Sequence, residues 1–125
     1  MDEQPYRQCI EACDACADAC DNCAASCLHE ADVQSMTRCI ALDIDCAQVC
    51  RLAAAMMSRG SEFASLLCRD CAQICEVCAE ECSRHPMEHC QRCAQACRDC
   101  ASLCRHMASM PAGLQGSTGA GIAAH

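Results

Sequence analysis

Cysteine is the residue type whose number and spacing could do chemistry in this chain. Nineteen of the 125 residues are cysteines, and they fall into four segments. In three segments consecutive cysteines are separated by alternating steps of three and four residues, and the second segment keeps the same phase with steps of seven and four. Residues at this spacing share one face of an α-helix, so each segment predicts a helix with a stripe of thiols. The cysteines are Cys9, Cys13, Cys16, Cys20, Cys23, Cys27, Cys39, Cys46, Cys50, Cys68, Cys71, Cys75, Cys78, Cys82, Cys90, Cys93, Cys97, Cys100 and Cys104.

The chemistry available to such stripes is the binding of soft metal ions. Thiolates select Cu(I), Zn(II) and iron–sulfur clusters. If each Cu(I) replaces about one thiol proton, a loaded core stays close to neutral, and neutrality matters because isolated charges are costly in a low-dielectric interior. Four thiolates on one Zn(II) leave a charge of −2 per site, and the chain contains no lysine to offset it. The pattern therefore favours many Cu(I) ions, about one per cysteine.

Other uses of the thiols fit the pattern less well. A zinc or mixed-metal thiolate buffer remains the main alternative. An iron–sulfur carrier would be expected to contain a run such as C-x2-C-x2-C-x3-C-P, which the chain lacks. Disulfides between neighbouring turns are disfavoured because Cβ atoms there lie about 5–6 Å apart, whereas a disulfide requires about 3.5–4.5 Å. A redox switch would not need nineteen thiols, and no arrangement of an open metal position with a general base indicates an enzyme.

The thiol stripes must be positioned by four helices, which we expect over residues 5–28, 33–58, 62–84 and 86–109. Asp32 is a candidate N-cap, Gly60 follows the second helix, and Pro86 suits the first turn of the fourth. Short links force consecutive helices to lie antiparallel. The expected fold class is therefore all-α, an antiparallel up-down-up-down four-helix bundle with a cysteine-lined core over residues 1–110. Residues 111–125 are Gly-rich, and we expect a disordered tail.

Histidines and one aspartate could extend the metal site. His85 follows Cys82 by three residues and continues the third stripe, and His89 adjoins Cys90, so both are candidate ligands. Asp43 falls on the stripe of the second helix. It either lies at the edge of the stripe and reaches solvent, or it has a buried partner or a metal nearby, because an unpaired buried carboxylate is costly.

Bulk properties restrict the partners. The formal net charge of −8 disfavours nucleic acid, and no apolar run is long enough to span a membrane. The N-terminal residues contain no apolar leader, so we expect a cytoplasmic protein. A second apolar set lies off the cysteine stripes, and we expect it to form contacts between copies of the chain, as a tetramer. This set is Ile40, Ile44, Val49, Phe63, Leu67, Ile74 and Val77.

The repeated C-x3-C-x2-C pattern, together with the run CSRHPMEHC at residues 82–90, resembles the bacterial copper storage proteins, and in particular their cytosolic branch. The resemblance covers about residues 5–110. It implies a homotetramer of four-helix bundles, with Cu(I) bridged by cysteine pairs along each core and with histidine assisting near one mouth. His85 and His89 lie where that branch often has histidines. The resemblance does not specify a chaperone or copper enzyme that receives the metal.

Overall fold

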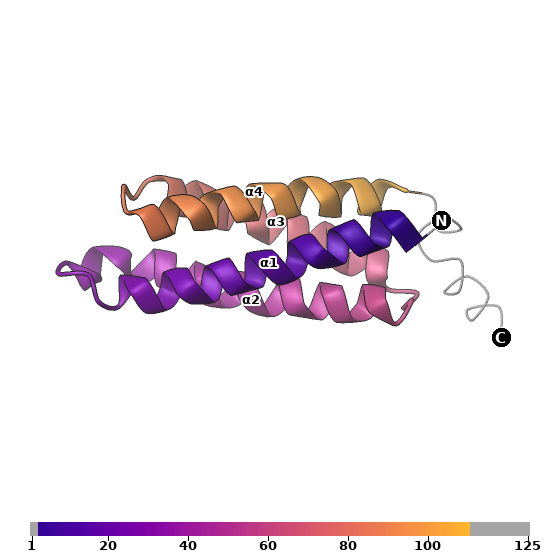
Figure 1. The fold of residues 1–125 in the computed structure, drawn as a ribbon, viewed down its shortest axis with the longest axis horizontal. Helices are drawn as coiled ribbons and strands as arrows, with labels where there is room; N and C mark the ends of the chain where they lie inside the picture. Colours follow the sequence, from indigo (N-terminus) through magenta and orange to yellow (C-terminus); the bar gives the residue numbers. More distant parts are fainter. Residues whose placement is uncertain (1–2, 111–125) are drawn as a thin grey trace.

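The computed structural model describes residues 3–110, and over this range the chain folds into four long α-helices and one short 3-10 helix (Figure 1). None of the described residues forms a strand. Each helix packs against its neighbours in the sequence, and α1 also packs against α4, so the bundle closes on itself. The expected fold class is confirmed. The elements are α1 (Glu3–Cys27), η1 (Val33–Met36), α2 (Thr37–Ser58), α3 (Ala64–Ser83) and α4 (Glu88–Ser109).

The second helix begins later than expected because the chain first makes the 3-10 turn η1. The side chain of Asp32 makes no capping hydrogen bond, so its assignment as an N-cap of the long helix was wrong. Instead, the Asp32 carbonyl accepts hydrogen bonds from the backbone N–H and the hydroxyl of Ser35, at 3.2 and 2.9 Å. These bonds tighten the turn, and α2 starts only at Thr37.

The other two expected end signals have different outcomes. Gly60 has a φ of 67°, and the N–H groups of Gly60 and Ser61 donate to the carbonyls of Met57 and Met56, which is the paired-bond pattern that ends many helices. Pro86 does not lie in the first turn of α4. Met87 is extended and precedes the helix, which begins at Glu88, so Pro86 belongs to the link instead.

The core consists almost entirely of small side chains. All nineteen cysteines are fully buried, and alanines from all four helices are buried beside them. Met36, Met57 and Met107 are the buried methionines of the described range. Among residues 3–110, no helix has the length and apolar character needed to cross a bilayer. The expectation of a disordered tail at 111–125 lies outside the described residues.

Candidate metal centre

The thiols form one column along the axis of the bundle, because every helix presents its stripe of cysteines to the interior. Sulfur atoms from different helices approach closely: Cys39 and Cys82 are 3.4 Å apart, and Cys16 and Cys97 are 3.6 Å apart. Within one helix, Cys16 and Cys20 are 4.0 Å apart. All nineteen cysteines lie among the described residues and all are free thiols. These separations fall within the roughly 4.6 Å that two sulfurs can span when both bind one metal at about 2.3 Å.

Sets of four thiols lie close enough to share a single metal ion, and the sets overlap. Within a set every pair of sulfurs lies within 4.8 Å, and each of the five sets given next draws on three helices. Five such sets are Cys13–Cys71–Cys100–Cys104, Cys16–Cys46–Cys50–Cys75, Cys16–Cys20–Cys46–Cys97, Cys20–Cys78–Cys93–Cys97 and Cys23–Cys27–Cys39–Cys90. Among these five, Cys16, Cys20, Cys46 and Cys97 each belong to two sets. The thiols are therefore a continuous array of adjoining sites instead of separate pockets.

Asp43 interrupts the sulfur column from α2, and of its two expected placements the structure supports the buried one. Its side chain is fully buried. The thiols of Cys78, Cys93 and Cys82 donate to Oδ1 at 3.3, 3.3 and 3.4 Å, and Cys39 lies 3.8 Å from Oδ2. Burial is the largest of the causes that raise the pKa of Asp43 to about 10. Asp43 is thus a neutral carboxylic acid at neutral pH, so its burial does not carry the cost of burying a charge.

One end of the column is formed by Cys27, Cys39 and Cys90, which are fully buried, and His89 lies beside them. We call this end of the column the mouth. The Nδ1 atom of His89 is 3.6 Å from the Cys90 sulfur and 3.9 Å from the Cys27 sulfur. On the other side of the ring, Nε2 lies 3.0 Å from Glu30 Oε2. Of the two candidate histidines, His89 is therefore the one whose ring nitrogen faces thiols directly.

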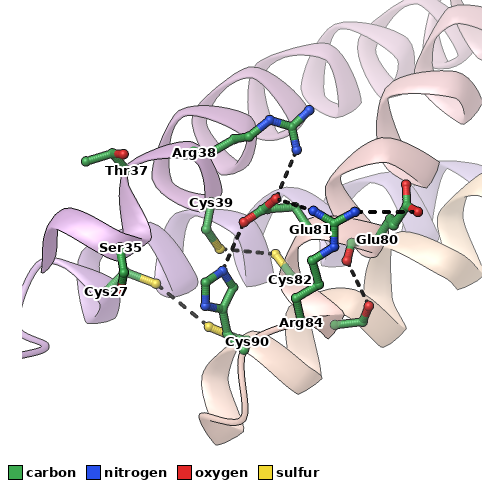
Figure 2. Close-up of polar contacts among 12 residues, drawn as sticks. Cys27, Ser35, Thr37, Arg38, Cys39, Glu80, Glu81, Cys82, Arg84 and Cys90 are labelled. Carbon is green, nitrogen blue, oxygen red and sulfur yellow. Dashed lines mark hydrogen bonds and ion pairs between the residues drawn. The ribbon is translucent and has the colours of Figure 1, made fainter. Parts of the chain in front are cut away.

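His85 is held differently. Its Nε2 lies 3.0 Å from Oε2 of Glu81, a nearly buried carboxylate. Figure 2 shows Glu81 between the guanidinium groups of Arg38 and Arg84, which donate to Oε1 at 2.9 and 3.4 Å. The hydrogen bond from His85, followed by that from Arg38, lowers the pKa of Glu81 despite its partial burial. The same view shows the close Cys39–Cys82 and Cys27–Cys90 sulfur pairs.

The mouth thiols differ in acidity. Burial, followed by the charge of Cys39, raises the pKa of Cys90 to about 11, and the same causes raise that of Cys27. Hydrogen bonds from Cys23 and Cys82 lower the pKa of Cys39 to about 3. Cys39 is therefore the mouth thiol best prepared to carry a negative charge, and metal binding at the others releases protons.

Glu30, Glu81 and Arg38 lie at the mouth although the cysteine spacing gives no sign of them. Glu81 lies four residues before His85, and this spacing is a local signal that could have been used. Glu30 lies 59 residues from His89 in the sequence and leaves no local signal of their contact.

A helical bundle whose core is a continuous array of buried thiols belongs to the class of proteins that hold several soft metal ions together. The comparisons with known proteins make this specific. The family model described as copper storage protein (Csp) matches residues 2–109, and the chain belongs to that family. The resemblance seen in the sequence is thereby confirmed.

Relatives support the same family. The chain is 46% identical, over 92 residues, to an uncharacterized cysteine-rich protein of Bacillus subtilis, YhjQ; the match covers 74% of this chain and 85% of that protein. The structure resembles the Cu(I)-bound copper storage protein BsCsp3 of Bacillus subtilis, with a TM-score of 0.82 and 45% identity over 85% of this chain and all of that one. It also resembles a cytosolic copper storage protein from Streptomyces lividans with five coppers, with a TM-score of 0.85 and 40% identity over 88% of this chain and 97% of that one.

Proposed function

We propose that this protein stores and sequesters Cu(I) in the cytosol, holding many ions on its core thiolates at about one per cysteine. The observation that carries the proposal is the sulfur column: nineteen fully buried free thiols, sixteen of which fall in the five four-thiol sets that each span three helices. The solved relatives are described as Cu(I)-bound and as a cytosolic copper storage protein. Storage, not catalysis, is the role that fits this array.

The charge of the filled core favours a monovalent ion. A thiolate that belongs to two adjoining sites can bridge two metal ions. Bridging reduces the number of negative charges that are buried for each metal ion. One Cu(I) for each thiol proton lost keeps the core near neutrality, whereas isolated Zn(II) sites would each bury a charge of −2. Charge thus selects copper over zinc in this core.

We assign the ligands as all nineteen cysteines, with His89 and His85 assisting at the mouth. His89 has the stronger support, because its Nδ1 faces the Cys27 and Cys90 sulfurs. His85 is supported by its place at the same end of the column, next to Glu81. Its ring would have to turn or exchange its Glu81 contact to reach a copper ion.

Anaerobic titration of the reduced protein with Cu(I), against a competing chelator, tests the function. We expect uptake to continue to about 19 Cu(I) per chain, one for each of the nineteen cysteines. Double substitution of Cys50 and Cys75 by alanine is expected to lower the capacity, while Ser102→Ala on the exposed face of α4 serves as the matched control and leaves it unchanged. Saturation at about four or five metals, with zinc competing effectively, would instead support zinc sites of four thiolates each.

We also propose that the protein is a homotetramer assembled through α2 and α3. Of the seven apolar residues expected at this contact, Ile44, Phe63 and Val77 are exposed, whereas Ile40, Val49, Leu67 and Ile74 are partly buried against the core. Leu52 and Leu66 are also exposed, so most of the large exposed apolar side chains of the described residues lie on or next to α2 and α3. A concentration of exposed apolar side chains on two neighbouring helices marks a protein–protein contact.

Light scattering coupled to gel filtration tests the assembly. We expect a mass about four times that of the 13.4 kDa chain. Ile44→Glu places a charge in the apolar face and is expected to yield smaller species, while Gln8→Glu adds the same charge to the exposed side of α1 and leaves the tetramer intact. A monomeric wild-type protein would contradict the proposal.

A further inference from the structure

The His89 ring lies between two kinds of partner, and each ring nitrogen has its own. Nε2 is 3.0 Å from the Glu30 carboxylate, while Nδ1 faces the sulfurs of Cys90 and Cys27 at 3.6 and 3.9 Å. A carboxylate only accepts hydrogen bonds, so the proton of the neutral ring must be on Nε2 when this contact is made. The lone pair of Nδ1 then points to the two thiols.

Glu30 is held in place by its own backbone. It follows α1 in the turn Leu28–Asp32, and its N–H donates to the carbonyl of Cys27 at 3.1 Å. This turn fixes Glu30 beside the end of α1, and the side chain reaches across to the first turn of α4. The contact therefore joins the two helices that supply Cys27 and Cys90.

From this geometry we infer that Glu30 is a positioning residue, which orients His89 so that Nδ1, Cys27 and Cys90 present three ligands to one Cu(I) at the mouth. The inference rests on the proposed storage function. A carboxylate behind a histidine ligand fixes its tautomer and ring orientation and makes it more basic, and removal of such a partner typically weakens metal binding by about 10–100-fold. Glu30 itself does not touch the ion.

The second carboxylate–histidine pair at this end shows why Glu30 is specific. Glu81 also contacts a histidine Nε2, but it shares its carboxylate with Arg38 and Arg84, so it links α2 to α3 as well as contacting His85. The Glu30 contact is the one that directs a histidine nitrogen at two thiols. The two pairs are therefore not interchangeable.

Nitrogen NMR of the reduced apo-protein tests the orientation, recorded at alkaline pH so that the signal comes from the neutral ring. Assignment of His89 uses the His89→Ala variant. We expect the wild type to show the tautomer protonated on Nε2. Glu30→Ala is expected to yield a mixture of tautomers, and Glu30→Gln, whose amide oxygen still accepts, is expected to retain mostly the wild-type form. Glu88→Ala removes an exposed carboxylate one residue before His89 and is the matched control.

Copper binding at the same ring provides the second readout. Cu(I) is added against a competing chelator, and the free Cu(I) concentration at which the His89 signal shifts is compared between variants. We expect Glu30→Ala to require about 10-fold more free Cu(I), with total capacity unchanged. A wild-type tautomer or an unshifted midpoint in Glu30→Ala overturns the inference. If the wild type takes up no Cu(I), the storage function fails, and the tautomer measurement still decides whether Glu30 orients the ring.

Discussion

Loading the reduced protein with Cu(I) is expected to raise its thermal unfolding midpoint by at least about 10 °C. A ligand that binds the folded state stabilises it by about 2.7 kcal/mol when present at 100 times its dissociation constant. For a domain of this length, 1 kcal/mol corresponds to a shift of about 4 °C. One site filled to this extent is enough for the expected increase, and filling further sites adds to it.

The structure explains why the effect should be large. The set Cys16–Cys46–Cys50–Cys75 joins α1, α2 and α3, and the set Cys13–Cys71–Cys100–Cys104 joins α1, α3 and α4. An ion in either set fastens three helices to one another. In the apo-protein the same helices are held by the packing of small cysteine and alanine side chains. Each small side chain buries little apolar area, so the free energy of unfolding is smaller for the apo-protein than for the loaded protein.

Differential scanning calorimetry of apo and loaded protein under anaerobic conditions measures the increase. Cys46→Ala removes a thiol shared by two of the sets and is expected to reduce the increase, while Ser102→Ala, on the exposed side of α4, leaves it unchanged. Equal midpoints for the apo and loaded wild type would contradict the idea that copper cross-links the helices.

The fold and the burial of the thiols could be predicted because helical periodicity determines them. Cysteines spaced by three and four residues share a helix face, and four such helices joined by short links bury all four stripes when they form an antiparallel bundle. The complete burial of the nineteen thiols follows from this. Nothing beyond local spacing was needed.

The histidines show where periodicity stops being informative. His85 is in phase with the third stripe only if the helix continues to it, but α3 ends at Ser83. Beyond that point the chain turns, and the His85 ring contacts Glu81. The neighbour of a thiol is instead His89, whose position depends on the first turn of α4 and on a residue from the distant turn after α1. Such contacts are tertiary and are not encoded in spacing.

Asp43 could be placed on the stripe from the sequence, but not assigned to solvent or to the core. The outcome depends on three thiols from two other helices, Cys78, Cys82 and Cys93, which donate to the same carboxyl oxygen. These donors compensate for the loss of water, and they become visible only when the helices are assembled.

The stability of the apo-protein is expected to fall as pH rises from about 5.5 to 7.5, because Asp43 keeps its proton when folded. An unfolded aspartate ionises near pH 4, whereas the folded pKa is about 10. Between these values the folded state holds one more proton. The stabilisation is therefore complete below about pH 4 and is lost progressively as pH rises toward 10, by about 1.4 kcal/mol per pH unit. Over two units this amounts to about 3 kcal/mol, a large part of the 5–15 kcal/mol typical of a domain.

Urea unfolding of the metal-free, reduced protein at several pH values in this interval measures the slope. Asp43→Asn replaces the carboxyl group by an amide that does not titrate, and its unfolding free energy is expected to be flatter with pH by about 1.4 kcal/mol per unit, whatever its absolute level. Asp45→Asn alters an exposed aspartate two residues away and keeps the wild-type slope. Identical slopes for the wild type and Asp43→Asn would mean that Asp43 is ionised in the folded core. The buried carboxylate would then carry a full charge. Only the hydrogen bonds that three thiols donate to one of its oxygens would offset the cost of burying that charge.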